Sequence, residues 1–366
     1  MKSFITIIAI ALMSIFTINV ANATVKTVSN NVNTPGQYST LAGAITYAGS
    51  GDTIYLTPSP ITYGDIRISN SHLTIIGGGY NNPATQDNLT TIVGNIWISG
   101  NNSYFTCSGL QVTNVYYDNY TNYNQSSYIT ISLCNISGYL SIGGSNWVVQ
   151  NCIIADLRIG YGQSTSVYLL QNSISNTAVR NNIVTGAVTG IPFQSNNYFY
   201  HNIFEGHLNG LSVCTFNDNI FFYSDLANST GQSNCVFNNN GVYSGNASAE
   251  LNYMSANGNI STNNVSSSIS PIFNNSVSSA QNFAGLLNYD WTIVSGAPEN
   301  NTATDGTDMG IYGGSFPMPY YSGFPTNQNF TGTTQIPQMV YMNIPTPSVG
   351  IGQPLINVEF IARKQK

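Results

Sequence analysis

One aspartate and two arginines are the side chains best suited to chemistry in this sequence. Asp156 and Arg158 lie two residues apart, so in a β-strand both side chains point to the same face. Arg180 follows Arg158 by 22 residues, close to the spacing at which similar segments recur. In register, two guanidinium groups beside one carboxylate would bind an acidic sugar, and an arginine base beside an acid would permit β-elimination. The alternative is a solvated ion pair with a separate surface arginine.

A second polar group contains two histidines and one acid. His201, Glu205 and His207 lie within seven residues of one another. A histidine can act as a general acid or base near neutral pH, but it needs a defined partner. The pattern supplies none, so it favours a turn position for His201.

Four tyrosines mark a candidate ligand-binding surface. They lie in an Asn-rich stretch between Gln111 and Ser127, which we expect to project as a loop. Aromatic rings stack on sugar faces and carry a polar edge, so such a loop would suit a carbohydrate. The alternative is a soluble surface that is merely rich in tyrosine. The four residues are Tyr116, Tyr117, Tyr120 and Tyr123.

The five cysteines leave at least one thiol unpaired. Cys134 and Cys152 are 18 residues apart, and Cys214 and Cys235 are 21 apart, so each pair could occupy neighbouring coils within disulfide range. Buried thiols that pack as small apolar side chains are the alternative that we favour. The spacings match no zinc site, and we expect no metal or other cofactor.

A repeat provides the elements that would position these residues. An Asn or a small residue followed by Ile recurs at intervals of 17, 21, 9, 20 and 17 residues. An interval near 20 is about one coil of a solenoid with three short strands, and the interval of 9 fits a second strand within one coil. We expect the isoleucines to point inward and form one core, and the asparagines to stack in a ladder at the turns. The isoleucines are Ile136, Ile153, Ile174, Ile183, Ile203 and Ile220.

Both ends of this solenoid show signs of a cap. Ser39 or Thr40 could begin a short amphipathic helix whose apolar positions run from Leu41 to Ala48, with Gly49 as its stop. Residues 315–366 form a Pro-rich extension with two apolar segments, 339–344 and 355–361, which predict a strand pair folded back over the last coil. A secretion or anchoring signal is the alternative for this extension.

The first 23 residues predict export. A basic start, the apolar run of residues 4–20 and a small-x-small site ending at Ala23 are typical of a signal peptide, so the mature chain would begin at Thr24 and be secreted or lie at the cell surface. No later stretch predicts a transmembrane segment. The net charge is −6, and residues 27–362 contain no lysine and three arginines, which excludes nucleic acid as a partner.

Several motifs resemble the pectin-lyase-like superfamily, in particular secreted right-handed β-helix repeat proteins of the Bacteroidetes type. They are Gly-Asp-Thr-Ile at residues 51–54, Leu-Thr-Ile-x-Gly at 73–77, the Asn-Ile coils at 181–184, 201–204 and 218–221, and Asp-x-Gly-x-Tyr-Gly-Gly at 308–314. The resemblance covers residues 34–314. It implies an all-β fold, a right-handed parallel β-helix over residues 24–314, and it says little about activity.

Two functions are compatible with this sequence. The first is a non-catalytic extracellular scaffold that binds a polysaccharide or cell-surface glycan, or contributes to adhesion. The second is a polysaccharide lyase that acts on uronate-containing glycans through Asp156, Arg158 and Arg180, for which the resemblance would allow calcium. A hydrolase is disfavoured, because the sequence has no Asp-Asp pair and no Gly-x-Gly-x-Asp repeat.

Overall fold

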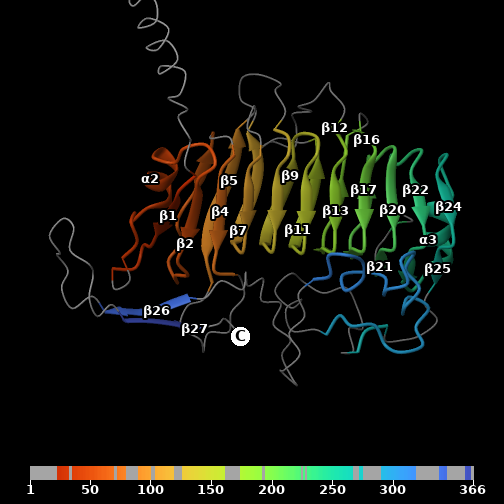
Figure 1. The fold of residues 1–366 in the computed structure, drawn as a ribbon. Coiled ribbons are helices and arrows are strands. Elements are labelled where there is room, and N and C mark those ends of the chain that lie inside the picture. The colour runs from red at the N-terminus through yellow and green to blue at the C-terminus, as the bar shows by residue number, and fades with distance from the viewer. Residues whose placement is uncertain are drawn as a thin grey trace, which may run out of the picture.

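The protein is a right-handed parallel β-helix built around two long parallel sheets (Figure 1). The computed structural model describes residues 23–32, 35–69, 72–79, 90–99, 104–118, 126–160, 174–191, 194–223, 226, 229–266, 272–274, 290–318, 338–343 and 359–363. Neighbouring strands in each long sheet come from successive coils and pair in parallel. The predicted fold class is therefore confirmed.

Each described coil contributes one strand to the first sheet. In order, these are β1 (Val25–Val28), β2 (Thr53–Leu56), β4 (Thr74–Gly77), β6 (Thr106–Ser108), β8 (Thr130–Ser132), β10 (Val148–Gln150), β13 (Ala178–Arg180), β17 (Asn197–Tyr200), β20 (Cys214–Asn217), β22 (Val236–Asn238) and β24 (Ile260–Thr262). Their inward side chains stack in register, as in the column Phe199, Phe216 and Phe237, whose ring centroids are 4.5 and 4.8 Å apart.

The second sheet bends within each coil and so has two arms. Its strands are β3 (Ile66–Ile68), β5 (Ile92–Ser99), β7 (Gln111–Asp118), β9 (Asn135–Ile142), β11 (Ile153–Ile159), β14 (Ile183–Val184), β15 (Val188–Thr189), β18 (Ile203–Phe204), β19 (Leu208–Asn209), β21 (Ile220–Phe222), β23 (Gly241–Tyr243) and β25 (Val265–Ser266). In β11 the register shifts between Ile154 and Asp156, and the next coil divides there into β14 and β15. We call the stretch aligned with β14 the first arm and the stretch aligned with β15 the second arm. Together with the first sheet, they enclose the core.

The predicted isoleucine column exists, but it faces outward. Ile153, Ile183, Ile203 and Ile220 pair in register along the first arm. The interior instead holds the next residue of each coil, such as Phe204, while the isoleucines pack against residues 291–318. The prediction that these four fill the interior is therefore wrong. Consecutive strand residues face opposite sides of a sheet, and both sides of the first arm are buried here.

The asparagine ladder at the turn before the first arm is confirmed. Each Asn accepts, at its side-chain oxygen, hydrogen bonds from the backbone N and the amide Nδ2 of the Asn one coil earlier, at 2.8–3.0 Å. The amide nitrogens also donate to backbone carbonyls. These buried amides are hydrogen bonded throughout, so the asparagines need no catalytic explanation. The ladder contains Asn182, Asn202, Asn219, Asn240 and Asn264.

The predicted N-terminal helix is α2 (Leu41–Thr46). The hydroxyl of Thr40 accepts a hydrogen bond from Gly43 N at 3.2 Å, and Leu41, Ala44 and Ile45 are buried over the first coil. The other helix among the described residues, α3 (Ala247–Met254), lies against β23 and β25 and was not predicted.

The two C-terminal segments form an antiparallel pair, β26 (Gln338–Asn343) and β27 (Glu359–Arg363), as predicted. In Figure 1 this pair lies at the opposite end of the view from β24 and β25. It therefore does not cover the last coil. There the strand β24 leaves Ile260 57% exposed.

Candidate functional site

The two arginines of the predicted catalytic set lie on different sheets. Arg158 is in β11 of the second sheet, beside Ser141 and Thr189. Arg180 is in β13 of the first sheet, in register with Gln150. The coil between them is longer than the others, because the position of Gln150 recurs after 30 residues rather than about 20. The spacing of 22 therefore moves from one sheet to the other, and the prediction of stacked arginines is wrong.

Arg180 is engaged by its own surroundings. Its Nε and Nη2 atoms donate to Gln150 Oε1 at 3.0 and 2.8 Å. Its guanidinium carbon lies 3.6 Å from the ring centroid of Phe316, in the segment that covers the first arm. This arginine fastens the C-terminal segment to the first sheet and does not face Asp156.

Asp156 belongs to a column of Asp and Asn side chains at the bend between the two arms. Its Oδ1 accepts a hydrogen bond from the backbone N of Ala187 in the next coil, at 2.9 Å. Asp65 and Asn114 make equivalent bonds to the coils that follow them, each at 2.7 Å. A glycine faces each of these oxygens, because a Cβ there would lie only 2.1 or 2.2 Å from it. The three glycines are Gly94, Gly138 and Gly186. Asp156 thus has a structural partner.

The outward side of the second arm carries a different set of residues, which we call the arginine-aromatic strip. Arg67 and Trp97 are in register, with the guanidinium carbon 5.2 Å from the indole centroid. Trp97 is in register with Tyr116, and their rings stack with centroids 6.0 Å apart. Further along, the guanidinium carbon of Arg158 lies 3.4 Å from the ring centroid of Tyr139. Arg67 is exposed, and the other four are partly exposed.

The middle of this strip is electrostatically continuous. Burial raises the pKa of Tyr116, Tyr139 and Asp65 raise it further, and Arg158 acts in the opposite direction. These groups therefore lie close enough to interact with the Tyr116 hydroxyl. The carboxylate oxygens of Asp65 and Asp156 are hydrogen bonded to the backbone of the next coil. A guanidinium stacked on a ring keeps the N–H groups in its plane for other acceptors. The arrangement therefore suits an acidic ligand.

The predicted tyrosine loop is wrong for two of its residues. Tyr116 and Tyr117 lie in strand β7, so their side chains point to opposite sides. Tyr117 is completely buried and packs against Gly143, and burial raises its pKa to about 12. It cannot contact a ligand, whereas Tyr116 belongs to the strip. Tyr120 and Tyr123 lie outside the described residues.

The turn position predicted for His201 is confirmed. Asn181, His201, Asp218 and Asn239 follow aligned strands of the first sheet, and all have φ between 53° and 58°. This left-handed conformation suits Asn and Asp, which explains most of the column. Glu205 is buried and His207 is exposed, so these neighbours do not share one environment.

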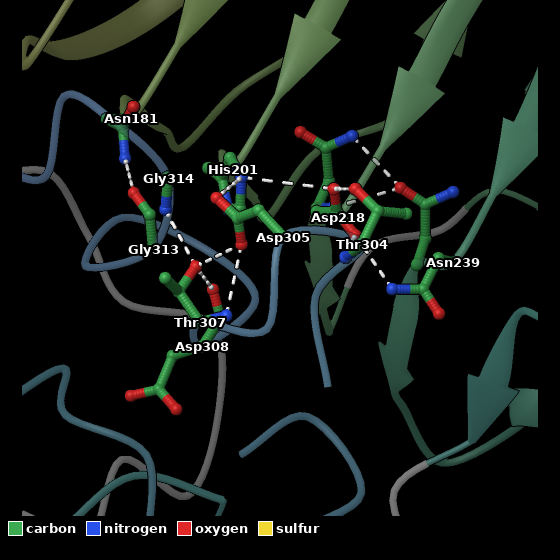
Figure 2. A network of polar contacts seen from close by, with 12 residues as sticks. Asn181, His201, Asp218, Asn239, Thr304, Asp305, Thr307, Asp308, Gly313 and Gly314 are labelled. Carbon is green, nitrogen blue, oxygen red and sulfur yellow. Dashed lines mark hydrogen bonds and ion pairs between the residues drawn. The ribbon is translucent and has the colours of Figure 1, made fainter. Parts of the chain in front are cut away.

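Figure 2 shows that residues 302–314 are fastened to this column of turns. Asp218 accepts hydrogen bonds from Thr304 N and Thr304 Oγ1 at 2.8 and 2.5 Å. Asn181 donates to the carbonyl oxygens of Ile311 and Gly313, and Asn239 donates to that of Thr302. The motif of residues 308–314 therefore runs along the flank and does not close the end of the solenoid.

The imidazole of His201 resembles a catalytic histidine in its acidic surroundings but not in its geometry. Its Nε2 lies 3.8 Å from Asp218 Oδ2 and 3.9 Å from Asp305 Oδ2, beyond hydrogen-bond distance. Gly313 and Gly314 cover the ring so closely that a Cβ on either would approach it within 2.7 Å. Burial lowers the pKa of His201, and the two aspartates oppose this shift. We assign this network to docking of the C-terminal segment.

No family model matches the chain. A search of curated proteins also found no match. The fold is thus shown by the structure, whereas the superfamily suggested by the sequence motifs stays a prediction.

All five cysteines are buried free thiols, so the predicted disulfides are not formed. Cys134 and Cys152 do occupy neighbouring coils, and so do Cys214 and Cys235, as predicted. Cys134 and Cys152 stand in the position that the asparagine ladder takes in later coils, and Cys152 N donates to Asn182 Oδ1. Among the described residues, no three His, Cys, Asp or Glu side chains gather closely enough to hold a metal ion. No helix in this part of the chain has the length and apolar character to span a membrane.

Sequence reasoning missed three members of the strip, namely Arg67, Trp97 and Tyr139. Their spacing is irregular because the coils differ in length. The Asp or Asn that precedes a strip residue, and the Gly one coil later, could have aligned these coils.

Proposed function

We propose that this protein is an extracellular β-helix that binds acidic polysaccharide along the arginine-aromatic strip. The observation that supports this most directly is the placement of Arg67 and Arg158 at the two ends of a row of partly exposed rings. Two of the three arginines of residues 27–362 thus share one face of a chain that has a net charge of −6. Such a local concentration of guanidinium groups is unexpected on an acidic protein unless it meets an acidic partner.

The geometry favours a linear ligand that lies parallel to the solenoid axis. Four strand-to-strand steps separate β3 from β11, which is a span of about 19 Å at about 4.8 Å a step. A chain of uronic acid residues could place one carboxylate at each guanidinium fork. The rings and hydroxyl groups of Trp97, Tyr116 and Tyr139 would then contact the sugars between them.

The chemistry of the strip supports binding rather than cleavage. A lyase needs a base that is held beside its neutralising groups, and neither Asp156 nor Arg180 is available to Arg158 in that way. A stable solenoid with a glycan-binding flank suits a role in surface adhesion. Export through the predicted signal peptide would place the protein where such polymers occur.

Binding of polygalacturonate to the chain that begins at Thr24 tests this proposal. Isothermal titration should detect binding to the acidic polymer, and the binding should weaken with added salt. The methyl-esterified polymer, which has the same backbone without the charges, is the matched control and should bind at least tenfold more weakly. Equal affinity for both polymers would contradict the proposal. Release of unsaturated products, followed by ultraviolet absorbance, would instead establish a lyase.

Three arginine variants locate the site. Arg67→Ala and Arg158→Ala should each weaken binding about tenfold or more, because a charge-assisted hydrogen bond contributes about 1.5–3 kcal/mol. Arg180→Gln removes the same charge from the first sheet and should change the affinity less than twofold. An equal loss in all three variants would show that net charge, not the strip, governs binding.

A further inference from the structure

The carboxylate of Asp52 is buried beside the first ordered residues of the solenoid. It is 4% exposed and belongs to the Gly-Asp-Thr-Ile stretch that leads into β2. Its Oδ1 accepts hydrogen bonds from the backbone N and the hydroxyl of Thr24, at 2.7 and 2.9 Å. Its Oδ2 accepts from Gly49 N at 2.8 Å and lies 3.2 Å from Lys26 Nζ.

These contacts give Asp52 a strong preference for the ionised state. Burial alone would raise its pKa, but the donors from Thr24, Gly49 and Lys26 lower it to about 2. The carboxylate is therefore negative at any physiological pH. A buried charge needs partners of opposite sign, and Lys26 contacts only one of its two oxygens.

The other oxygen faces the position where the sequence predicts the end of a signal peptide. Thr24 is the residue that would follow the cleaved bond, and its carbonyl accepts from Thr53 N at 2.9 Å, as the first rung of the β1 to β2 ladder. Ala23, on the other side of that bond, is exposed. The bond between the two residues thus lies where the chain leaves the solenoid.

We propose that Asp52 is the binding site for the α-ammonium group that processing creates at Thr24. Hydrolysis of the Ala23–Thr24 peptide bond consumes one water, leaves a carboxylate on Ala23 and gives Thr24 a positively charged amine. The nitrogen that donates to Asp52 Oδ1 as a neutral amide then donates as an ammonium. Removal of the leader thereby adds an ion pair that stabilises the first coil. This inference rests on the predicted cleavage site and is independent of glycan binding.

The new charge has few neighbours. In the part of the chain that the structure describes, the charged groups in contact with Thr24 are Asp52 and Lys26. The ion pair favours the protonated amine, so its pKa should rise above the ordinary range of about 7.7–8.0. The stability that it contributes is complete below that range and is lost as the pH rises through the higher pKa of the folded state.

Two preparations of the chain that begins at Thr24 test the proposal. One has a free amine, and the other is acetylated at Thr24, which retains an N–H donor but removes the charge. The free-amine form should have a Tm about 2–6 °C higher at pH 6.5, and the difference should shrink above pH 9. The amine of the folded protein should also react about fivefold more slowly with an acylating ester at pH 8 than the amine of a peptide of residues 24–28.

Two substitutions complete the test. In Asp52→Asn, acetylation should no longer change the Tm, and the amine should react as it does in the peptide. Asp65→Asn is the matched control, because Asp65 also accepts a backbone N–H but lies away from Thr24, and it should leave both results unchanged. The proposal is overturned if acetylation leaves the Tm of the parent chain unchanged, or if the folded amine reacts as fast as the peptide. N-terminal sequencing of the exported protein would overturn the cleavage site itself if it found a start other than Thr24.

Discussion

Ile203 and Phe204 are consecutive residues on opposite sides of one sheet, and both are completely buried. Phe204 belongs to the interior of the solenoid, whereas Ile203 packs beneath residues 291–318. Gly310 lies directly over the Ile220 and Ile203 side chains. The second half of this solenoid therefore has two hydrophobic cores, and the first arm separates them.

Ile203→Ala should destabilise the protein as strongly as a substitution in the interior. We expect a loss of about 2–4 kcal/mol in the free energy of unfolding, because the side chain is fully buried and its neighbours in the column cannot collapse around it. Thr189→Ala, on the outward side of the open second arm, should cost less than about 1 kcal/mol. Denaturant unfolding measures both. A small effect of Ile203→Ala would mean that residues 291–318 do not cover this face in solution.

The docking network of Asp218 makes a separate prediction about the same segment. Asp218→Ala removes the acceptor for Thr304 N, Thr304 Oγ1 and Asn239 Nδ2, so we expect a loss of about 2–3 kcal/mol. Amide hydrogen exchange should rise in residues 302–314 before it rises in the first sheet. Asp308→Ala is the control: its Oδ1 accepts one bond, from Asn301 N within the same segment. Uniform exchange across the whole chain would argue against a detachable segment.

The pKa of His201 predicts acid sensitivity. Burial lowers this pKa from about 6.5, so the folded state favours the neutral ring, although Asp218 and Asp305 oppose the shift. The contribution of a neutral buried His is complete above about pH 6.5 and is lost as the pH falls through the lower pKa of the folded state. The Tm should therefore fall between pH 7.5 and pH 5.5.

His201→Asn separates this effect from other acid effects. Asn occupies the same turn at positions 181 and 239, so it tolerates the left-handed backbone there. The variant should lose most of the Tm change between pH 7.5 and pH 5.5. The carboxylates with lowered pKa, Asp52 and Asp305, lose their contributions only below about pH 3.8, in a separate range. An unchanged pH profile in the variant would assign the acid sensitivity to other groups.

Local patterns predicted the parts of the fold that depend on neighbouring residues. The cap of α2, the strand alternation and the asparagine ladder all follow from short motifs that repeat from coil to coil. The direction of the isoleucines could not be predicted in this way. It depends on residues 291–318, which are far away in sequence and make the outer side of the first arm as apolar as the inner side.

The candidate site depended on coil length, which the isoleucine spacing did not provide. Arg158 and Arg180 appeared to be one coil apart, but the insertion between them makes that coil 30 residues long. The strip residues are likewise separated by unequal intervals, so Arg67 and Trp97 had no visible relation to Arg158. Once the bend column of Asp65, Asn114 and Asp156 aligns the coils, the strip follows from the sequence.

That alignment rule can be tested at Gly94. A Cβ at this position would lie 2.2 Å from Asp65 Oδ1, whereas the nearest backbone atom, the carbonyl carbon of Gly64, is 3.2 Å away. The conflict is thus mainly with one side chain. Gly94→Ala should destabilise the protein by about 2–3 kcal/mol, as overpacking does in a site that cannot expand. Gly245→Ala, where a Cβ would meet nothing within 4 Å, should be nearly neutral.

A double-mutant cycle identifies the cause of the Gly94→Ala effect. Asp65→Ala alone should destabilise the protein by about 1–2 kcal/mol, because Asn95 N loses its acceptor. In the double variant the added methyl group occupies the space that the carboxylate leaves. The combined loss should therefore be smaller than the sum of the single losses by at least about 1 kcal/mol, as measured by denaturant unfolding. Additive losses would show that Gly94 is required by its backbone rather than by the oxygen of Asp65, and the coil alignment based on this column would lose its physical basis.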